Sequence, residues 1–217
     1  AEELGRALSL AGFAVVTGGG PGIMEAANRG ACDMGKESVG LNIVLPHEQL
    51  PNSFVTPELS FQFHYFALRK MHFLLRARAV AVFPGGFGTF DEFFELLTLI
   101  QTGKVRPLPV LLFGREFWSK VVDFQALADE GVIAPHDLDL IHWCEEADEA
   151  WEFVQHYYDA VAGPHWPEGR RHGGADPLLL RGALGARQPR GRGHATRARW
   201  PPASARLRVA RRRPPAA

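Results

Sequence analysis

The residues best suited to chemistry in this chain lie between Ala79 and Glu95, in the stretch AVAVFPGGFGTFDEFFE. An apolar run typical of a buried strand is followed by a turn that contains Gly85, Gly86 and Gly88. Glycines leave the backbone open, so a ligand can approach the N–H groups at the start of the next helix. The pattern predicts a phosphate-binding turn, with the Glu92 carboxylate directly after it.

The same stretch also has a purely structural interpretation. Thr89 and Glu92 have the T-x-x-E spacing of a capping box, in which both side chains bond the first N–H groups of their own helix. This interpretation predicts a helix from Thr89 to Gly103 and gives Glu92 no chemical role. A capping box does not require three glycines in the preceding turn, which favours a ligand site.

The segment P-G-G-F-G-T-F-D-E resembles the P-G-G-x-G-T-x-x-E signature of the Lonely Guy (LOG) family, with all six fixed positions present. These proteins are phosphoribohydrolases that cleave the N-glycosidic bond of nucleoside 5′-monophosphates, and they were often labelled lysine decarboxylases. The segment V-V-T-G-G-G-P-G-I-M-E-A-A-N-R-G-A is similar to the corresponding part of bacterial members. The resemblance implies a hydrolase that converts AMP or cytokinin riboside 5′-monophosphates to free base and ribose 5-phosphate, without a metal or cofactor.

The resemblance also implies roles for individual residues. Arg69 and Glu92 are as far apart in sequence as the catalytic Arg and Glu of the family, so both are expected to be catalytic. Lys70 completes an R-K pair that the family carries upstream of its glycine signature. The expected substrate contacts are Glu48, Lys70, Gly85, Gly86, Phe87, Gly88, Thr89, Thr98, Gly19 and Gly20. Glu48 could equally be a solvated loop carboxylate, and Thr98 could serve only helix packing or capping.

Three rival functions remain at this point. A nucleotide or cofactor carrier on the same fold would keep the glycines and bind without cleaving. A dehydrogenase is disfavoured, because either G-x-G-x-x-G frame in TGGGPG puts Ile23 or Glu25 in place of the last glycine. A pyridoxal-phosphate decarboxylase would need a reactive lysine, and the body of the chain offers Lys36, Lys70, Lys104 and Lys120 in no recognisable cofactor setting.

Around these motifs the sequence predicts an α/β fold, a doubly wound Rossmann-like parallel sheet. Predicted strands are Phe13–Val16, Ser38–Leu45, Val80–Phe83, Leu108–Phe113 and Leu138–Cys144. Predicted helices are Ala1–Leu10, Ile23–Ala31, Phe61–Arg78, Thr89–Gly103, Arg115–Glu130 and Glu145–Ala162. The family implies a further strand before Ala1, so the sheet is expected to lack its first strand. The aromatic surface of Phe61–Leu75 predicts a homodimer or higher homo-oligomer.

Composition divides the chain into a domain at residues 1–163 and a tail at residues 164–217. The chain has no net charge, but the tail holds thirteen Arg and no Lys against Glu168 and Asp176. It is rich in Arg, Pro, Ala and Gly and cannot bury a core, so it is expected to be disordered. It could bind nucleic acid, but out-of-frame translation is favoured because the composition changes where the last helix of the family ends. Two cysteines, with neither a signal peptide nor a membrane span, predict a cytoplasmic protein.

Overall fold

The structure is a computed structural model that describes residues 1–44 and 50–162, with side chains described through residue 160. Its strands are β1 Val15–Thr17, β2 Ser38–Ile43, β3 Ser60–Phe63, β4 Val80–Val82, β5 Val110–Phe113 and β6 His142–Cys144. Its α-helices are α1 Glu2–Leu10, α2 Ile23–Asp33, α3 Phe66–Leu74, α4 Phe87–Gln101, α5 Arg115–Val121, α6 Phe124–Asp129 and α7 Ala147–Ala162. Two short 3₁₀ helices are η1 Pro57–Leu59 and η2 Pro135–Leu140. The predictions for Glu48 and for the tail at residues 164–217 lie outside the described residues.

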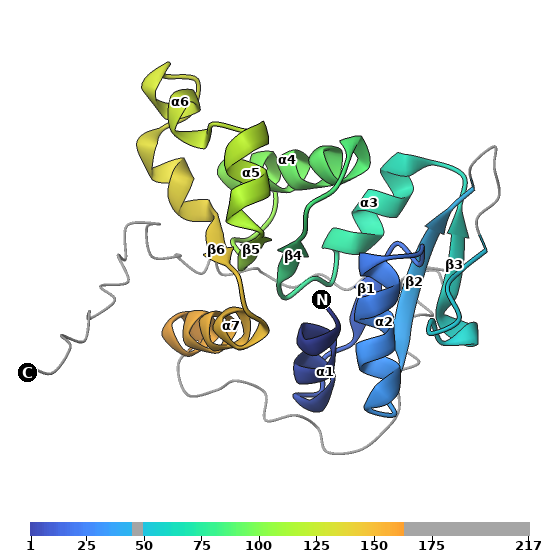
Figure 1. The fold of residues 1–217 in the computed structure, drawn as a ribbon. Helices are drawn as coiled ribbons and strands as arrows, with labels where there is room; N and C mark the ends of the chain where they lie inside the picture. Colours follow the sequence, from blue (N-terminus) through green and yellow to red (C-terminus); the bar gives the residue numbers. More distant parts are fainter. Residues whose placement is uncertain (45–49, 163–217) are drawn as a thin grey trace, which may run out of the picture. The chain divides into compact units, whose positions relative to one another are not determined.

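The strands form two parallel three-stranded sheets, with the orders β1-β2-β3 and β4-β5-β6 (Figure 1). Strands alternate with helices along the chain, which confirms the predicted α/β fold with parallel strands. β1 ends at Thr17 and leads into the first glycine loop, and β4 ends at Val82 and leads into the second. Both loops therefore lie at carboxyl ends of parallel strands, where α/β folds place their ligand sites.

Both faces of the second sheet are covered. Alternate residues of β5 point to opposite faces, and each set packs against different helices. Val110 and Leu112 belong to a buried cluster with Phe93, Leu96 and Trp118 from α4 and α5. Leu111 and Phe113 belong to a second cluster, which contains residues of α1 and α7. All four β5 residues are buried, as the uninterrupted apolar run predicts for a central parallel strand.

Helices α1 and α2 lie side by side and pack closely through two glycines (Figure 1). A Cβ built on Gly30 of α2 would lie 2.1 Å from the Glu2 carbonyl oxygen, and one on Gly5 of α1 would lie 2.5 Å from the Ala27 carbonyl oxygen. The bare backbones thus allow an approach that larger side chains would prevent. α1 also contacts α7, so it packs against elements of both sheets.

Several predicted element boundaries were wrong, and four of the differences affect the helices and strands near the two glycine loops or in the second sheet. Phe61 to Phe63, at the start of the predicted helix Phe61–Arg78, lie in strand β3, because Ser60–Phe63 alternates polar and apolar residues with a period of two, and the helix itself begins at Phe66. α4 begins at Phe87 rather than Thr89 and has Gly86 as its N-cap. The predicted helix Arg115–Glu130 is divided at Asp123, whose carboxylate accepts the Ala126 N–H and starts α6. Leu138 to Leu140 lie in η2, so the last strand begins at His142.

The close approach of α1 and α2 generates a stability prediction. Alanine is a better helix former than glycine by about 1 kcal/mol, yet we expect Gly30→Ala to reduce the free energy of unfolding by about 1–3 kcal/mol because its methyl group collides with the α1 backbone. Gly88→Ala in α4 is the matched control, since a Cβ there meets nothing within 4 Å. Urea unfolding of both variants checks this, and equal stabilities would contradict the packing described.

Candidate functional site

Arg69 and Glu92 face each other from neighbouring helices. The Arg69 Nη2 atom, on α3, donates to the Glu92 Oε1 atom, on α4, at 2.6 Å. The Arg69 side chain is 12% exposed and that of Glu92 is 36% exposed, so the carboxylate remains within reach of a ligand. The structure thus brings together the two residues predicted to be catalytic.

The environment of Glu92 opposes its ionisation. Burial raises the pKa of the Glu92 carboxyl above its ordinary value, and the nearby Asp91 carboxylate adds to the rise. The Arg69 guanidinium, by its charge and its hydrogen bond, and the Lys70 ammonium lower the pKa and limit the rise. A partly buried carboxylate with a raised pKa is suited to charge stabilisation or proton transfer.

Besides its bond to Glu92, the Arg69 guanidinium lies close to two aromatic rings and to the first glycine loop. Its central carbon lies 5.6 Å from the ring centroid of Phe66 and 5.6 Å from that of Phe73. A Cβ built on Gly18 would lie 3.7 Å from Arg69 Nη1, so the first glycine loop passes beside this group. Within residues 1–44 and 50–162, the buried Nε–H of Arg69 has no hydrogen-bond partner. Buried donors without a partner are uncommon in folded proteins.

Lys70, the neighbour of Arg69, has two carboxylate partners on α4. Its Nζ atom lies 2.9 Å from Asp91 Oδ1 and 2.9 Å from Glu95 Oε2. The hydrogen bond to Asp91 is the main cause that raises the pKa of the Lys70 ammonium. Its predicted contact with the nucleotide stays a prediction.

The second glycine loop is open at its tip. A Cβ on Gly86 or Gly88 would meet nothing within 4 Å, and the Phe87 side chain is 95% exposed. Gly85, in contrast, lies against Thr89, whose Oγ1 atom would be 2.2 Å from a Cβ at that position. The Thr89 N–H donates to the Gly86 carbonyl, so the N–H groups left without intrahelical partners are those nearest the start of α4.

The capping-box interpretation of Thr89 and Glu92 is wrong. α4 starts earlier than the box requires, and both residues lie inside the helix. Glu92 bonds Arg69 instead of an N–H group of its own helix. The structural alternative to a chemical role for Glu92 is therefore an ion pair between helices.

The first glycine loop is fixed by a network of polar side chains that sequence reasoning missed. The Thr17 hydroxyl donates to Asn28 Oδ1 at 2.7 Å and accepts the Gly19 N–H at 3.0 Å. The Asn52 amide donates to the Gly20 carbonyl and to Asn28 Oδ1, each at 3.0 Å. Asn28 is fully buried in the middle of α2. Asn28 lies one helical turn before Ala31, so both face the same side of α2. This helical spacing is the sequence signal for an inward-facing polar residue.

Gly19 and Gly20 are buried within this network. Gly19 adopts φ 71° and lies against Asn42, so only glycine fits there. The expected substrate contacts of both glycines stay predictions, and Gly18 is the loop residue that lies beside Arg69.

Thr98 lies further along α4, at an exposed position. Its hydroxyl donates to the Phe94 carbonyl at 2.8 Å, one turn back in the same helix. This bond is typical of threonine within a helix, and the hydroxyl oxygen keeps its capacity to accept a hydrogen bond. The predicted nucleotide contact of Thr98 is therefore neither supported nor opposed by its geometry.

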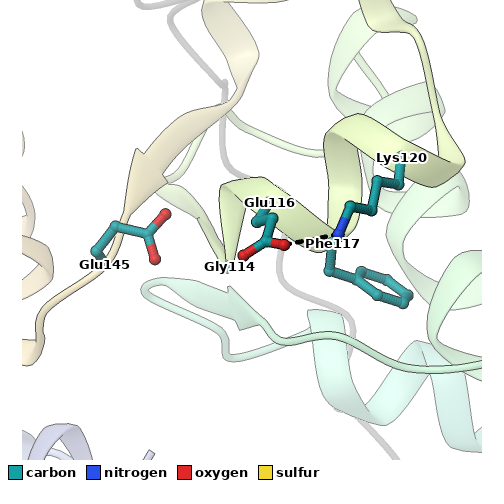
Figure 2. A pocket seen from close by; sticks show the side chains of 5 residues that line it. All are labelled: Gly114, Glu116, Phe117, Lys120 and Glu145. Carbon is teal, nitrogen blue, oxygen red and sulfur yellow. Dashed lines mark hydrogen bonds and ion pairs between the residues drawn. The ribbon is translucent and has the colours of Figure 1, made fainter.

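A pocket of about 600 Å³ lies at the carboxyl ends of β5 and β6 (Figure 2). Gly114, Glu116, Phe117, Lys120 and Glu145 line it. Its charged groups already have partners: Glu116 pairs with Lys120, and Glu145 accepts the Arg115 N–H at the start of α5. None of the residues predicted to be functional lines this pocket, so we assign the candidate site to Arg69 and Glu92.

No group of three or more His, Cys, Asp or Glu side chains among the described residues could hold a metal ion. None of the helices that the structure describes combines the length and the apolar character needed to cross a bilayer.

Comparison with known proteins identifies relatives of the chain. A family model described as "Possible lysine decarboxylase" matches residues 24–154. A probable cytokinin riboside 5′-monophosphate phosphoribohydrolase of Oryza sativa subsp. japonica is 26% identical over 182 residues, which cover 78% of this chain and 82% of the relative. A cytokinin riboside 5′-monophosphate phosphoribohydrolase of Rhodococcoides fascians is 29% identical over 160 residues, 69% of this chain and 77% of the relative.

Solved structures show a similar fold. The Moco carrier protein from Chlamydomonas reinhardtii matches with a TM-score of 0.51 and 22% identity, over 74% of this chain and 86% of that protein. A structural-genomics X-ray structure matches with a TM-score of 0.51 and 23% identity, over 71% and 85%. Identities this low carry information about the fold alone. The family model, in contrast, spans more than half of the chain and agrees with the curated relatives, so the chain belongs to this "Possible lysine decarboxylase" family, which is the LOG family.

Proposed function

We propose that the protein hydrolyses the N-glycosidic bond of nucleoside 5′-monophosphates, either AMP or cytokinin riboside 5′-monophosphates, to free base and ribose 5-phosphate. The observation that carries the proposal is the Glu92 carboxylate, which is partly exposed and paired with Arg69 beside two glycine loops. The names of the curated relatives support the same reaction.

The reaction breaks the bond between C1′ of the ribose and a nitrogen of the base. The bonding electron pair leaves with the base, and the ribose carbon develops positive charge, as in other glycoside hydrolyses. Water then forms a new C–O bond at C1′ and loses a proton. The departing base gains a proton, so the overall charge is unchanged. In this proposal the Glu92 carboxylate stabilises the ribosyl cation or takes the water proton, which both require its ionised form.

Arg69 and the second glycine loop would hold the rest of the nucleotide. The partly exposed Arg69 guanidinium would donate to a ribose or phosphate oxygen. The open backbone at Gly86 and Gly88, at the start of a 15-residue helix, suits an approaching phosphate. Gly85, Phe87 and Thr89 complete this loop, and Glu48, Thr98, Gly19 and Gly20 remain proposed contacts of the base or ribose.

A carrier that binds a nucleotide or cofactor without cleaving it is the second candidate. The structural likeness to the Moco carrier protein shows that the fold occurs in such a protein, but at 22% identity it supports the fold alone. An assay for free adenine from AMP separates the two functions, because a carrier would bind AMP and release none.

Self-association is part of the proposal, because α3 has an apolar surface with no cover among the described residues. All nine residues of α3 are described and none is buried. Its exposed apolar side chains and those next to it are Tyr65, Phe66, Leu68, Met71 and Leu75. A second copy of the chain is the proposed cover, which would place a subunit interface on the helix that carries Arg69.

The first prediction concerns Glu92→Gln. We expect it to lower base release from AMP by at least about a hundredfold and to change nucleotide affinity only a few fold, because a charge beside the ribosyl cation acts mainly in the transition state. Glu116→Gln is the control, since that side chain is 86% exposed and pairs within its own helix. Near-native turnover of Glu92→Gln would reduce Glu92 to a structural ion-pair partner.

The second prediction concerns the substrate. We expect AMP to be cleaved and free adenosine to be a poor substrate, because the open glycine loop is proposed to bind the 5′-phosphate. One base-release assay with AMP, adenosine, GMP and isopentenyladenosine monophosphate measures both phosphate dependence and base preference. Equal rates for AMP and adenosine would contradict the role given to Gly86 and Gly88.

The third prediction concerns assembly. Light scattering at micromolar concentration is expected to give a dimer or larger species for the native chain and a smaller one for Met71→Glu, because the variant places a charge on the exposed apolar face of α3. Circular dichroism controls for folding. A native monomer would remove this surface from the proposal and leave the hydrolase assay unaffected.

A further inference from the structure

Two sets of charged groups lie next to each other between α3 and α4. The first is the pair of Arg69 with Glu92. The second joins the adjacent Lys70 to Asp91 and Glu95, which flank Glu92 in sequence. The Lys70 side chain is only 17% exposed, although both of its partners are reached by solvent.

These contacts connect elements that belong to different sheets. α3 packs its backbone against β2 and β3 of the first sheet. α4 contributes Phe93, Leu96 and Ile100 to the buried cluster that contains Val110 and Leu112 of the second sheet. Leu74 at the end of α3 reaches that cluster, but the middle of α3 meets α4 through its two cations.

The position of Arg69 therefore depends on a helix, α3, whose residues are at most partly buried. With no buried residue in α3, apolar packing fixes this helix less firmly than it fixes α4. An exposed ion pair contributes little to stability, but an ammonium that is largely out of solvent and bound to two carboxylates is a stronger constraint. Because Lys70 directly follows Arg69, any movement of its backbone also moves the Arg69 side chain.

We infer that Lys70, with Asp91 and Glu95, is a positioning group that holds Arg69 against Glu92 and does not itself contact the nucleotide. The kinetic part of this inference rests on the proposed hydrolase function. It assigns Asp91 and Glu95 a role that neither the glycine signature nor the spacing of Arg69 and Glu92 indicates.

The test compares removal of the cation with removal of its partners. Lys70→Met removes the ammonium, whereas the double variant Asp91→Asn/Glu95→Gln leaves the ammonium in place and free to bind phosphate. If Lys70 is a positioning group, both proteins lose kcat for AMP on the order of tenfold to a hundredfold with KM changed by less than about threefold. Adding Lys70→Met to the double variant then costs little more.

A direct contact between Lys70 and substrate gives the opposite pattern. The double variant then keeps its kcat, Lys70→Met raises KM, and the two effects add in the triple variant. That result would overturn the inference. Lys120→Met is the matched control, because Lys120 also pairs with a carboxylate but lies in α5 with 70% of its side chain exposed.

A readout independent of turnover is the titration of Glu92, followed by ¹³C NMR of labelled glutamate side chains. Asp91 raises the pKa of Glu92 by its charge, so its neutralisation alone would lower that pKa. Loss of Arg69 from its position would raise it instead. A higher Glu92 pKa in Asp91→Asn/Glu95→Gln supports the inference even if the native chain releases no base, and a lower one contradicts it.

Discussion

The ion pair between Arg69 and Glu92 is the constraint on which the candidate site depends. A guanidinium that is 12% exposed requires an anionic partner, and the partner that it finds lies on a helix of the other sheet. The pair thus fixes α3 relative to α4 in the same contact that prepares a carboxylate for chemistry. Lys70 and its two carboxylates strengthen that contact from the next position along the helix.

The two glycine loops have different physical characters although their sequences look alike. Hydrogen bonds from Thr17 and Asn52 hold the first loop, whose Gly19 and Gly20 are buried. The second loop has open space at Gly86 and Gly88. The first loop is therefore suited to support the neighbouring Arg69 side chain, and the second loop is suited to bind a ligand.

Much of the fold could be predicted from local patterns. Apolar runs such as Val110–Phe113 and glycine turns before helices identify parallel strands and their loops. β3 was missed because Phe61 fits both a strand and the aromatic face expected of a longer helix. The capping box was wrong because Gly86, which has no side chain, could start the helix one turn earlier.

The site was only partly predictable for a different reason. Sequence spacing suggested Arg69 and Glu92 by resemblance, but it could not indicate that they meet, because their contact depends on how two sheets are joined. The buried Asn28 is a second example of a residue whose role depends on long-range contacts. Its oxygen binds groups that are distant in the chain, Thr17 and Asn52, and such long-range hydrogen bonds leave little trace in local sequence.

The position of α1 has a consequence for the order of folding. Leu4, near the start of the chain, is buried with Ala150 and Val154 of α7, so its packing joins the two ends of the described domain. Contacts so distant in sequence are slow to form, because the loop between them must first be closed. During synthesis the contacts of Leu4 with α7 therefore cannot form until α7 has left the ribosome, and apolar surface that waits for its partner favours aggregation.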